Sequence, residues 1–170
     1  MKSVSGLSGG NARAVFVAGL CIVLLAGFRV LRAAYLPELP NFSPVSAVAV
    51  CGAFLIPGVL GWLIPLGALM VSDLLLALVL GYPAVSGAQF VVWGTILALV
   101  GFARLAGRGG FSSVRYFGSV LGGGVFFYLV TNTASGVANP AYPRGLGGLW
   151  MSLTTGLPGF PPTWMFFRNS

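Results

Sequence analysis

Hydrophobic residues in this chain gather in long stretches that short polar segments separate. The stretch 59–80, VLGWLIPLGALMVSDLLLALVL, holds a single charge, Asp73. At about 1.5 Å per residue a helix of this length reaches roughly 33 Å, which matches a hydrocarbon core of about 30 Å. The pattern therefore predicts that 59–80 spans a membrane.

Other apolar stretches repeat this pattern at two lengths. Those at 14–31, 88–105 and 116–133 are long, whereas those at 45–56 and 146–157 are short. A helix over 45–56 cannot cross a bilayer alone, so it is either tilted and shielded by protein or a partial span. We expect an all-α integral membrane protein, a bundle of about five transmembrane helices plus one short re-entrant or interfacial helix.

Three regions follow from the same pattern. Residues 1–13 form a polar N-terminal tail, residues 14–157 form the transmembrane helical domain, and residues 158–170 form a short aromatic tail. Trp164, Phe166 and Phe167 lie beside Arg168 in that tail, a composition typical of the membrane interface. The apolar stretch 14–31 is longer than the core of a signal peptide and has arginines at its exit, so we interpret it as a span.

Composition supports the same class of protein. Hydrophobic residues make up 57% of the 170 positions and charged residues 6%, whereas soluble domains carry about 25% charged residues. The net charge is +7, but the nine basic residues are scattered at the ends of the apolar stretches. We therefore expect the lipid bilayer as a partner, with the basic residues as anchors, and no nucleic acid.

The basic residues also give a weak indication of topology. With the N-terminus in the cytoplasm and five full spans, five basic residues lie inside and four outside. The inner ones are Lys2, Arg13, Arg104, Arg108 and Arg115, and the outer ones are Arg29, Arg32, Arg144 and Arg168. The N-terminus is accordingly expected to be cytoplasmic.

Residue types that carry most enzyme and metal chemistry are scarce. The chain has no histidine, and its two cysteines, Cys21 and Cys51, fall inside apolar stretches. Its two acids, Glu38 and Asp73, belong to segments of different character, and no nucleophile has a base to activate it. We expect no metal, no cofactor and no catalytic activity.

Asp73 is the most informative polar residue because a charge within a span is costly. Insertion scales assign such an acid about 2.5–3.5 kcal/mol, so Asp73 should face protein or water and meet a cation. Arg29 and Arg144 are the possible ion-pair partners. Two roles stay open for Asp73: a structural clamp with arginine, or a site for a ligand or proton.

Small residues mark one predicted helix face. Gly118 and Gly122 form a GxxxG pair, and Ser119 and Gly123 repeat the spacing one residue later. Such a face lets another helix approach closely. The contact is either internal to the bundle or made with another protein.

Five short motifs occur in an order that resembles a known group of proteins. The chain is similar to an uncharacterised family of small bacterial membrane proteins, which is in turn similar to the substrate-binding S-components of energy-coupling factor vitamin transporters. The resemblance covers the chain from about Phe28 onward. The motifs are NFSP at 41–44, SDLLL at 72–76, FFYLVTN at 126–132, YPRGLGGL at 142–149 and FFRN at 166–169.

The resemblance implies a location and a site. It implies the inner membrane of a bacterium and a small ligand enclosed at the outer ends of the helices. The polar positions that would form a ligand site or a buried polar cluster are Asn41, Ser43, Asp73, Asn132, Tyr142 and Arg144. The family pattern continues into a further helix beyond FFRN, whereas this sequence stops at Ser170. An S-component without that helix has one wall of its cavity open to lipid.

Two functions fit these observations. The apolar surface and small-residue face fit a non-catalytic accessory or structural subunit of a larger membrane complex, whether respiratory, photosynthetic or transport. Other membrane-protein subunits are then the expected partners. The alternative is a subunit that resembles an S-component and binds a vitamin or another small solute for uptake.

Overall fold

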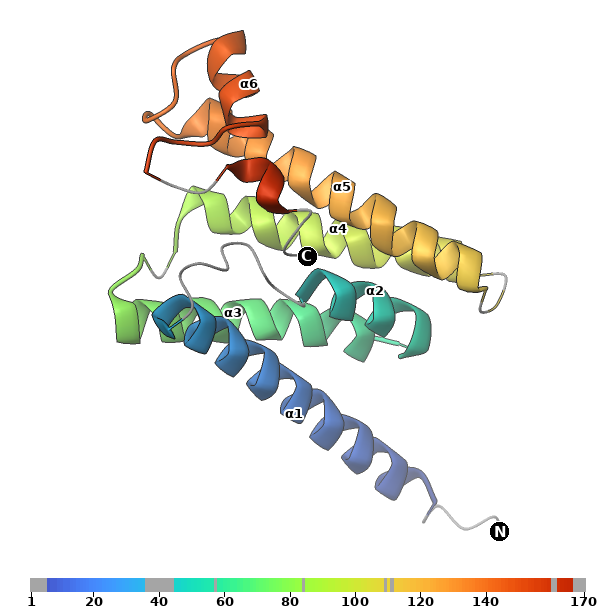
Figure 1. The fold of residues 1–170 in the computed structure, drawn as a ribbon. Helices are drawn as coiled ribbons and strands as arrows, with labels where there is room; N and C mark the ends of the chain where they lie inside the picture. Colours follow the sequence, from blue (N-terminus) through green and yellow to red (C-terminus); the bar gives the residue numbers. More distant parts are fainter. Residues whose placement is uncertain are drawn as a thin grey trace.

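The computed structural model describes residues 6–35, 45–56, 58–83, 85–108, 110, 112–159 and 162–166. In these residues the chain forms six α-helices and one 3-10 turn, with no strand, so the all-helical prediction is confirmed (Figure 1). The elements are α1 Gly6–Tyr35, α2 Val45–Leu55, α3 Leu60–Leu80, α4 Gly87–Gly107, α5 Ser113–Ala138, α6 Leu146–Leu153 and η1 Thr163–Met165.

Four of these helices are long and apolar enough to cross a membrane. They are α3, α4, α5 and the Val15–Tyr35 part of α1. The second helix, α2, has 11 residues, and α6 has 8. The predicted count of about five spans is therefore not confirmed, because α2 has only about half the length that a span needs.

The short α2 lets α1 and α3 run in the same direction. Ile22 of α1 lies against Gly67, where an added Cβ would come within 3.0 Å of the Ile22 side chain, and Arg29 lies farther along, beside Asp73. α2 follows the first half of α3 back to its start (Figure 1). Because α1 and α3 are parallel, their C-terminal ends lie on the same side of the bundle.

α3 and α4 form a tight antiparallel hairpin with defined caps. Gly81 ends α3 at a φ of +70°, a conformation that glycine adopts without steric cost. Its N–H bonds to the Ala77 carbonyl, and the Tyr82 N–H bonds to the Leu76 carbonyl, which closes the last turn. The Ser86 hydroxyl then accepts from the Gln89 N–H at the start of α4.

At the opposite end of the bundle, Arg104 of α4 joins α2 to α3. Its Nη2 donates to the Ile56 carbonyl at 3.1 Å and to the Gly58 carbonyl at 2.6 Å, and its guanidinium lies over the Trp62 ring. Gly61 leaves room for this side chain, since a Cβ there would lie 2.4 Å from Nη2. The arginine thus satisfies carbonyls that the end of α2 leaves without a helical partner.

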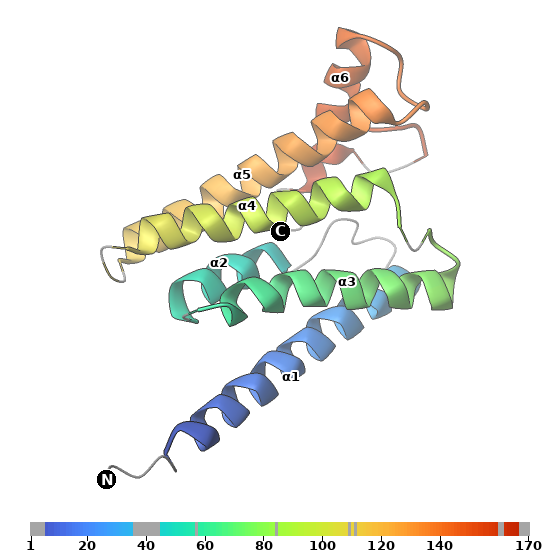
Figure 2. The same cartoon turned by 180° about the vertical axis from the view of Figure 1, so that it is seen from behind.

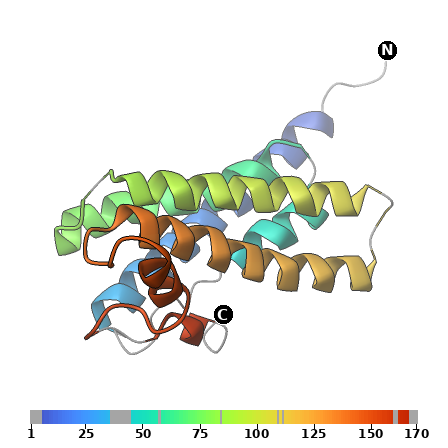
Figure 3. The ribbon, with the colours of Figure 1, turned by 90° about the horizontal axis from the view of Figure 1, so that it is seen from above.

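The core lies around α2, which packs against α3, α4 and α5. Figure 2 shows α1 on the outside of α3, and Figure 3 shows α4 and α5 side by side. Within the apolar windows, 39% of α3 is buried, compared with 17% of α1 and 11% of α5. Lipid or other proteins therefore have the most apolar surface to contact on α1 and α5.

The C-terminal part folds back on α5. Gly136 allows α6 to approach, because a Cβ there would lie 2.4 Å from the Ser152 hydroxyl. The Tyr128 hydroxyl donates to the Leu153 carbonyl, and the Thr163 hydroxyl donates to the Thr154 carbonyl at 2.8 Å. These bonds hold η1 close to α5.

Phe166 lies in a different environment from the one expected for the aromatic tail. Its ring is stacked 6.0 Å from that of Phe127 and is 8% exposed, whereas Trp164 is 53% exposed. Phe166 therefore packs inside the protein, because the bonds that hold η1 turn it toward α5. Phe167 and Arg168 lie outside the described residues.

Candidate functional site

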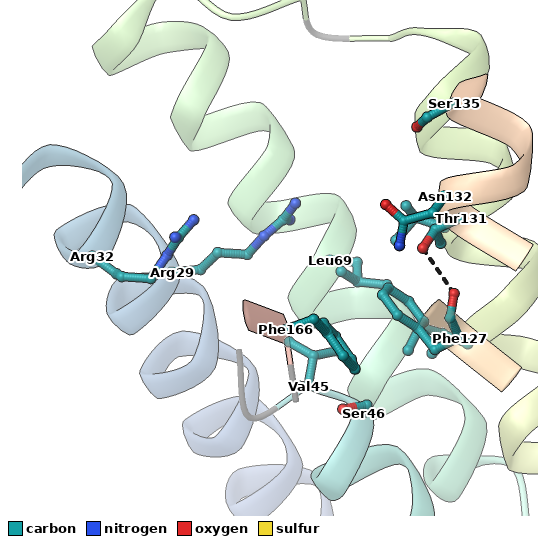
Figure 4. Close-up of a pocket in the computed structure, with 12 residues that line it drawn as sticks. Arg29, Arg32, Val45, Ser46, Leu69, Phe127, Thr131, Asn132, Ser135 and Phe166 are labelled. Atoms are coloured by element: carbon teal, nitrogen blue, oxygen red, sulfur yellow. Dashed lines mark hydrogen bonds between the residues drawn. The ribbon is translucent and has the colours of Figure 1, made fainter. Parts of the chain in front are cut away.

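A cavity of about 300 Å³ opens between the helices at the end where α1 and α3 finish (Figure 4). Five helices and the segment after η1 contribute to its wall. Its polar lining consists of Arg29, Arg32, Ser46, Thr131, Asn132 and Ser135, and its apolar lining consists of Val45, Leu69, Val92, Ile96, Phe127 and Phe166. Such a mixture of an apolar wall and a few convergent polar groups is typical of a small-molecule site.

Arg29 brings a charge from α1 to this cavity, because it continues the face of α1 that packs on α3. Ala18, Ile22 and Leu25 precede it on that face, at helical spacing. Arg29 Nη1 lies 2.5 Å from Asp73 Oδ1 and donates to the Ser72 hydroxyl at 2.6 Å.

The Asp73 carboxylate is held on both sides. Its other oxygen accepts from Trp93 Nε1 of α4 at 2.9 Å, and the Asp73 residue is 4% exposed. Ser72 is fully buried, and its hydroxyl donates a hydrogen bond to the Leu69 carbonyl at 2.9 Å. The acid therefore meets the conditions under which a charge is tolerated in a membrane protein, an opposite charge and further hydrogen bonds.

Arg29 retains donors after these bonds are made. Both bonds use Nη1, and among the described residues Nε and Nη2 have no hydrogen-bond partner. The Arg29 side chain is 23% exposed and lines the cavity. The Asp73 network thus fixes the position of a guanidinium whose remaining N–H groups are accessible.

The opposite wall belongs to α5 and consists of Thr131, Asn132 and Ser135 (Figure 4). The Thr131 hydroxyl donates to the Phe127 carbonyl at 2.8 Å, and Asn132 Nδ2 donates to the Tyr128 carbonyl at 2.9 Å. The Thr131 hydroxyl oxygen and Asn132 Oδ1 can accept further hydrogen bonds, and the Asn132 amide keeps one N–H that can donate. The two walls therefore differ in chemistry: the arginines of α1 offer donors alone, whereas α5 offers acceptors together with this N–H.

The residues predicted from sequence divide into three groups. Asp73, Arg29 and Asn132 come together at the cavity or directly behind it. Tyr142 and Arg144 lie in the connection after α5 and do not line it; Arg144 is exposed and forms no ion pair with Asp73. Asn41 and Ser43 lie outside the described residues.

Tyr142 is half-buried, and burial raises the pKa of its phenol above the ordinary value of 10. The phenol is therefore neutral at physiological pH. It can form hydrogen bonds in the connection after α5, but it adds no charge there.

Several lining residues escaped the sequence analysis, although spacing could have found some of them. Arg32 follows Arg29 by three positions, and Ser135 follows Asn132 by three, so each pair shares a helix face. Ser46 lies two residues after the NFSP motif. Phe166 was expected at the membrane interface, because a phenylalanine suits lipid as well as a protein interior.

The small-residue face of α5 also divides. A Cβ on Gly123 would lie 3.0 Å from Leu99, so this glycine serves packing against α4. Gly118 and Gly122 have nothing within 4 Å, and the Ser119 hydroxyl donates to the Arg115 carbonyl of its own helix. The GxxxG pair itself lines an apolar groove of about 230 Å³ beside Leu99, Phe102 and Ala103 of α4.

Metal-binding side chains do not gather in the described residues, where no group of three or more His, Cys, Asp or Glu occurs. Cys21 and Cys51 are free thiols, and Cys51 Sγ lies 2.7 Å from the Tyr116 hydroxyl. The arrangement at the cavity offers charge and hydrogen bonds, the means by which a protein can bind and orient a small molecule.

A family model described as a family of unknown function, DUF6580, matches residues 10–170. No curated protein and no solved structure matches the chain.

Proposed function

This chain belongs to the DUF6580 family of unknown function, and we propose that it is a non-enzymatic membrane subunit that binds a small water-soluble solute, in the manner of a transporter S-component. The observation that carries the proposal is the cavity of about 300 Å³ beside the Arg29–Asp73 pair. A purely structural ion pair needs no such space next to it. A solute site needs both the space and a positioned charge.

The distribution of basic residues supports an uptake orientation. Arg13, Arg104, Arg108 and Arg115 belong to the end of the bundle where α1, α3 and α5 begin. Arg29, Arg32 and Arg144 belong to the other end, which holds the cavity. Under the positive-inside rule the end with four arginines is cytoplasmic, and in a bacterial inner membrane the cavity then faces outward.

Phe166 bears on the expectation of an open wall. It lines the cavity, and it packs on Phe127 and Tyr128. The segment after η1 thus supplies part of the cavity wall, which supports a site formed within this chain.

The test is to identify what the cavity holds. The tagged full chain is purified from its native membrane in a gentle detergent and denatured, and the released small molecules are measured by mass spectrometry. We expect one solute in roughly stoichiometric amount from the wild type and its loss from Ser135→Phe, which fills the cavity. Val137→Phe is the matched control, because Val137 lies on the same helix and is 79% exposed.

The same preparation tests the transport role through its protein partners. Recovery with an ATPase and a coupling subunit would support uptake. No solute enriched over Ser135→Phe would contradict the proposal, whatever proteins accompany the chain.

A second function, an accessory subunit of a larger membrane complex, is favoured by a separate observation. α1 packs mainly on α3 and leaves Phe16, Leu24 and Val15 more than half exposed, and Gly118 and Gly122 are open on α5. These surfaces fit neighbouring helices as well as lipid. Stoichiometric recovery in a respiratory or photosynthetic complex, without a bound solute, would support this function instead.

A further inference from the structure

From the donors and acceptors around the cavity, we infer that its ligand is a small carboxylate with an apolar middle and a hydrogen-bond donor at its other end. This inference rests on the proposed solute site and adds the chemical class of the solute. It depends on three features: the accessible edge of Arg29, the acceptors on α5, and the apolar surface between them.

Arg29 is arranged to receive an anion. The Asp73–Ser72 network occupies Nη1 alone, so the guanidinium edge formed by Nε and Nη2 keeps its N–H groups while the side chain is held in place. Two parallel N–H donors match the two oxygens of a carboxylate. Asp73 stays bound to Trp93 Nε1, so the ligand adds to the network and does not have to displace the acid.

The basic side chains at the cavity favour an anion as well. Arg29 and Arg32 both line it. A cation would meet their charges in a site that is partly closed from water, which is costly.

The α5 wall sets the other end of the ligand. Asn132 Oδ1 and the Thr131 hydroxyl oxygen can accept hydrogen bonds, and Asn132 Nδ2 keeps its second N–H, since only one is used inside α5. A hydroxyl, which both donates and accepts, matches these groups better than a second carboxylate, which only accepts. Leu69, Ile96 and Phe127 supply the apolar surface between the two ends.

The volume limits the ligand to a small molecule. About 300 Å³ lies at the lower end of the range for ligand sites. A single aromatic ring with one substituent at each end fits this space. The probes chosen are therefore 4-hydroxybenzoate and its uncharged analogue 4-hydroxybenzamide, which has nearly the same shape.

The experiment measures affinities for these probes with the purified full chain in a neutral detergent, by calorimetric titration. We expect 4-hydroxybenzoate to bind at least about tenfold more tightly than the amide, because the amide cannot form the charge-assisted pair. Arg29→Lys should lose about tenfold for the acid and little for the amide, since lysine keeps the charge but not the planar donor edge. Arg108→Lys, an exposed arginine at the opposite end, should change neither affinity.

The comparison of the two probes on the wild type decides the matter even if Arg29→Lys does not fold. Equal or tighter binding of the amide would overturn the carboxylate inference and leave the solute site standing. Binding of neither probe, together with no solute released from the native protein, would overturn both.

A fatty acid of the bilayer presents the same carboxylate as a soluble acid, so palmitate is a third probe. Tighter binding of palmitate than of 4-hydroxybenzoate would overturn the small soluble ligand inferred here and the soluble solute of the proposed function. It would keep the carboxylate contact with Arg29.

Discussion

Arg29 of α1 and Asp73 of α3 form an ion pair, with Nη1 2.5 Å from Oδ1, across two helices that run in the same direction. Trp93 of α4 donates to the other carboxylate oxygen, so this one acid joins three helices. The pair lies directly beside the cavity lined by Arg29. Stability of the bundle and shape of the site are therefore coupled through Asp73.

Asp73→Asn should destabilise the protein, because it leaves the Arg29 charge without its counter-ion. Loss of one partner of a buried pair costs about 3–5 kcal/mol, and we expect about 2–3 kcal/mol here since Arg29 is 23% exposed. Denaturant titration in detergent measures the change, with Arg108→Gln as the control. In a double-mutant cycle with Arg29→Gln the two losses should not add; simple additivity would contradict the coupling.

Trp93→Phe should cost about 2 kcal/mol, because it removes the indole N–H that bonds to the Asp73 carboxylate and keeps most of the ring. Trp150→Phe is the control, since Trp150 is 71% exposed. The measurement is again the free energy of unfolding in detergent. Equal effects of the two substitutions would show that ring volume, not the hydrogen bond, is responsible.

Gly136→Ala should displace α6 from α5. The new Cβ would lie 2.4 Å from the Ser152 hydroxyl and 2.9 Å from its Cβ, and overpacking of this kind costs about 1–3 kcal/mol. Hydrogen exchange should rise over residues 146–153 in particular. Gly124→Ala, which meets nothing within 4 Å, should leave both stability and exchange unchanged or slightly improve stability.

Phe166→Ala should release the segment that closes the cavity without unfolding the four long helices. The ring contacts Phe127 and Tyr128, so its loss weakens the attachment of residues 162–166. We expect faster proteolysis of this segment and weaker binding of 4-hydroxybenzoate, with nearly unchanged melting of the rest. Trp164→Ala, at a 53% exposed position, should do neither. Unchanged binding in Phe166→Ala would remove the segment from the site.

Gly122→Leu separates an internal role of the GxxxG face from an external one. Because nothing lies within 4 Å of Gly122, the isolated protein should keep its stability. If a partner helix packs there, the larger side chain should reduce co-purification of that partner from native membranes. Leu121→Phe, at a neighbouring 73% exposed position, is the control for a merely larger apolar surface.

The helical architecture follows from the hydrophobic pattern because each apolar stretch maps onto one helix. The predicted stretch 59–80 also ends where α3 ends, at Leu80 before the Gly81 cap. The count of about five spans is not confirmed, because α2 is too short to count as one. Length alone showed that 45–56 is short, but only packing shows that a helix of this length reaches the middle of the bundle.

The site was less accessible to sequence reasoning because it depends on which helices are neighbours. The sequence predicts that Asp73 forms an ion pair, but charge alone does not distinguish Arg29 from Arg144 as its partner. The choice is made by the parallel packing of α1 on α3, a consequence of α2 that no local pattern encodes. Asn132 was predicted because it belongs to the FFYLVTN motif. Ser135 and Arg32 belong to no motif and could be predicted only from their spacing to Asn132 and Arg29 on the same helix faces.

The cavity takes its lining from nearly the whole length of the chain, from Arg29 in the first helix to Phe166 beyond η1. The ribosome adds Arg29 long before Phe166. A nascent chain that has not yet reached Phe166 therefore lacks part of the cavity wall, and a ligand that binds the complete cavity would stabilise only molecules in which both segments have folded into place.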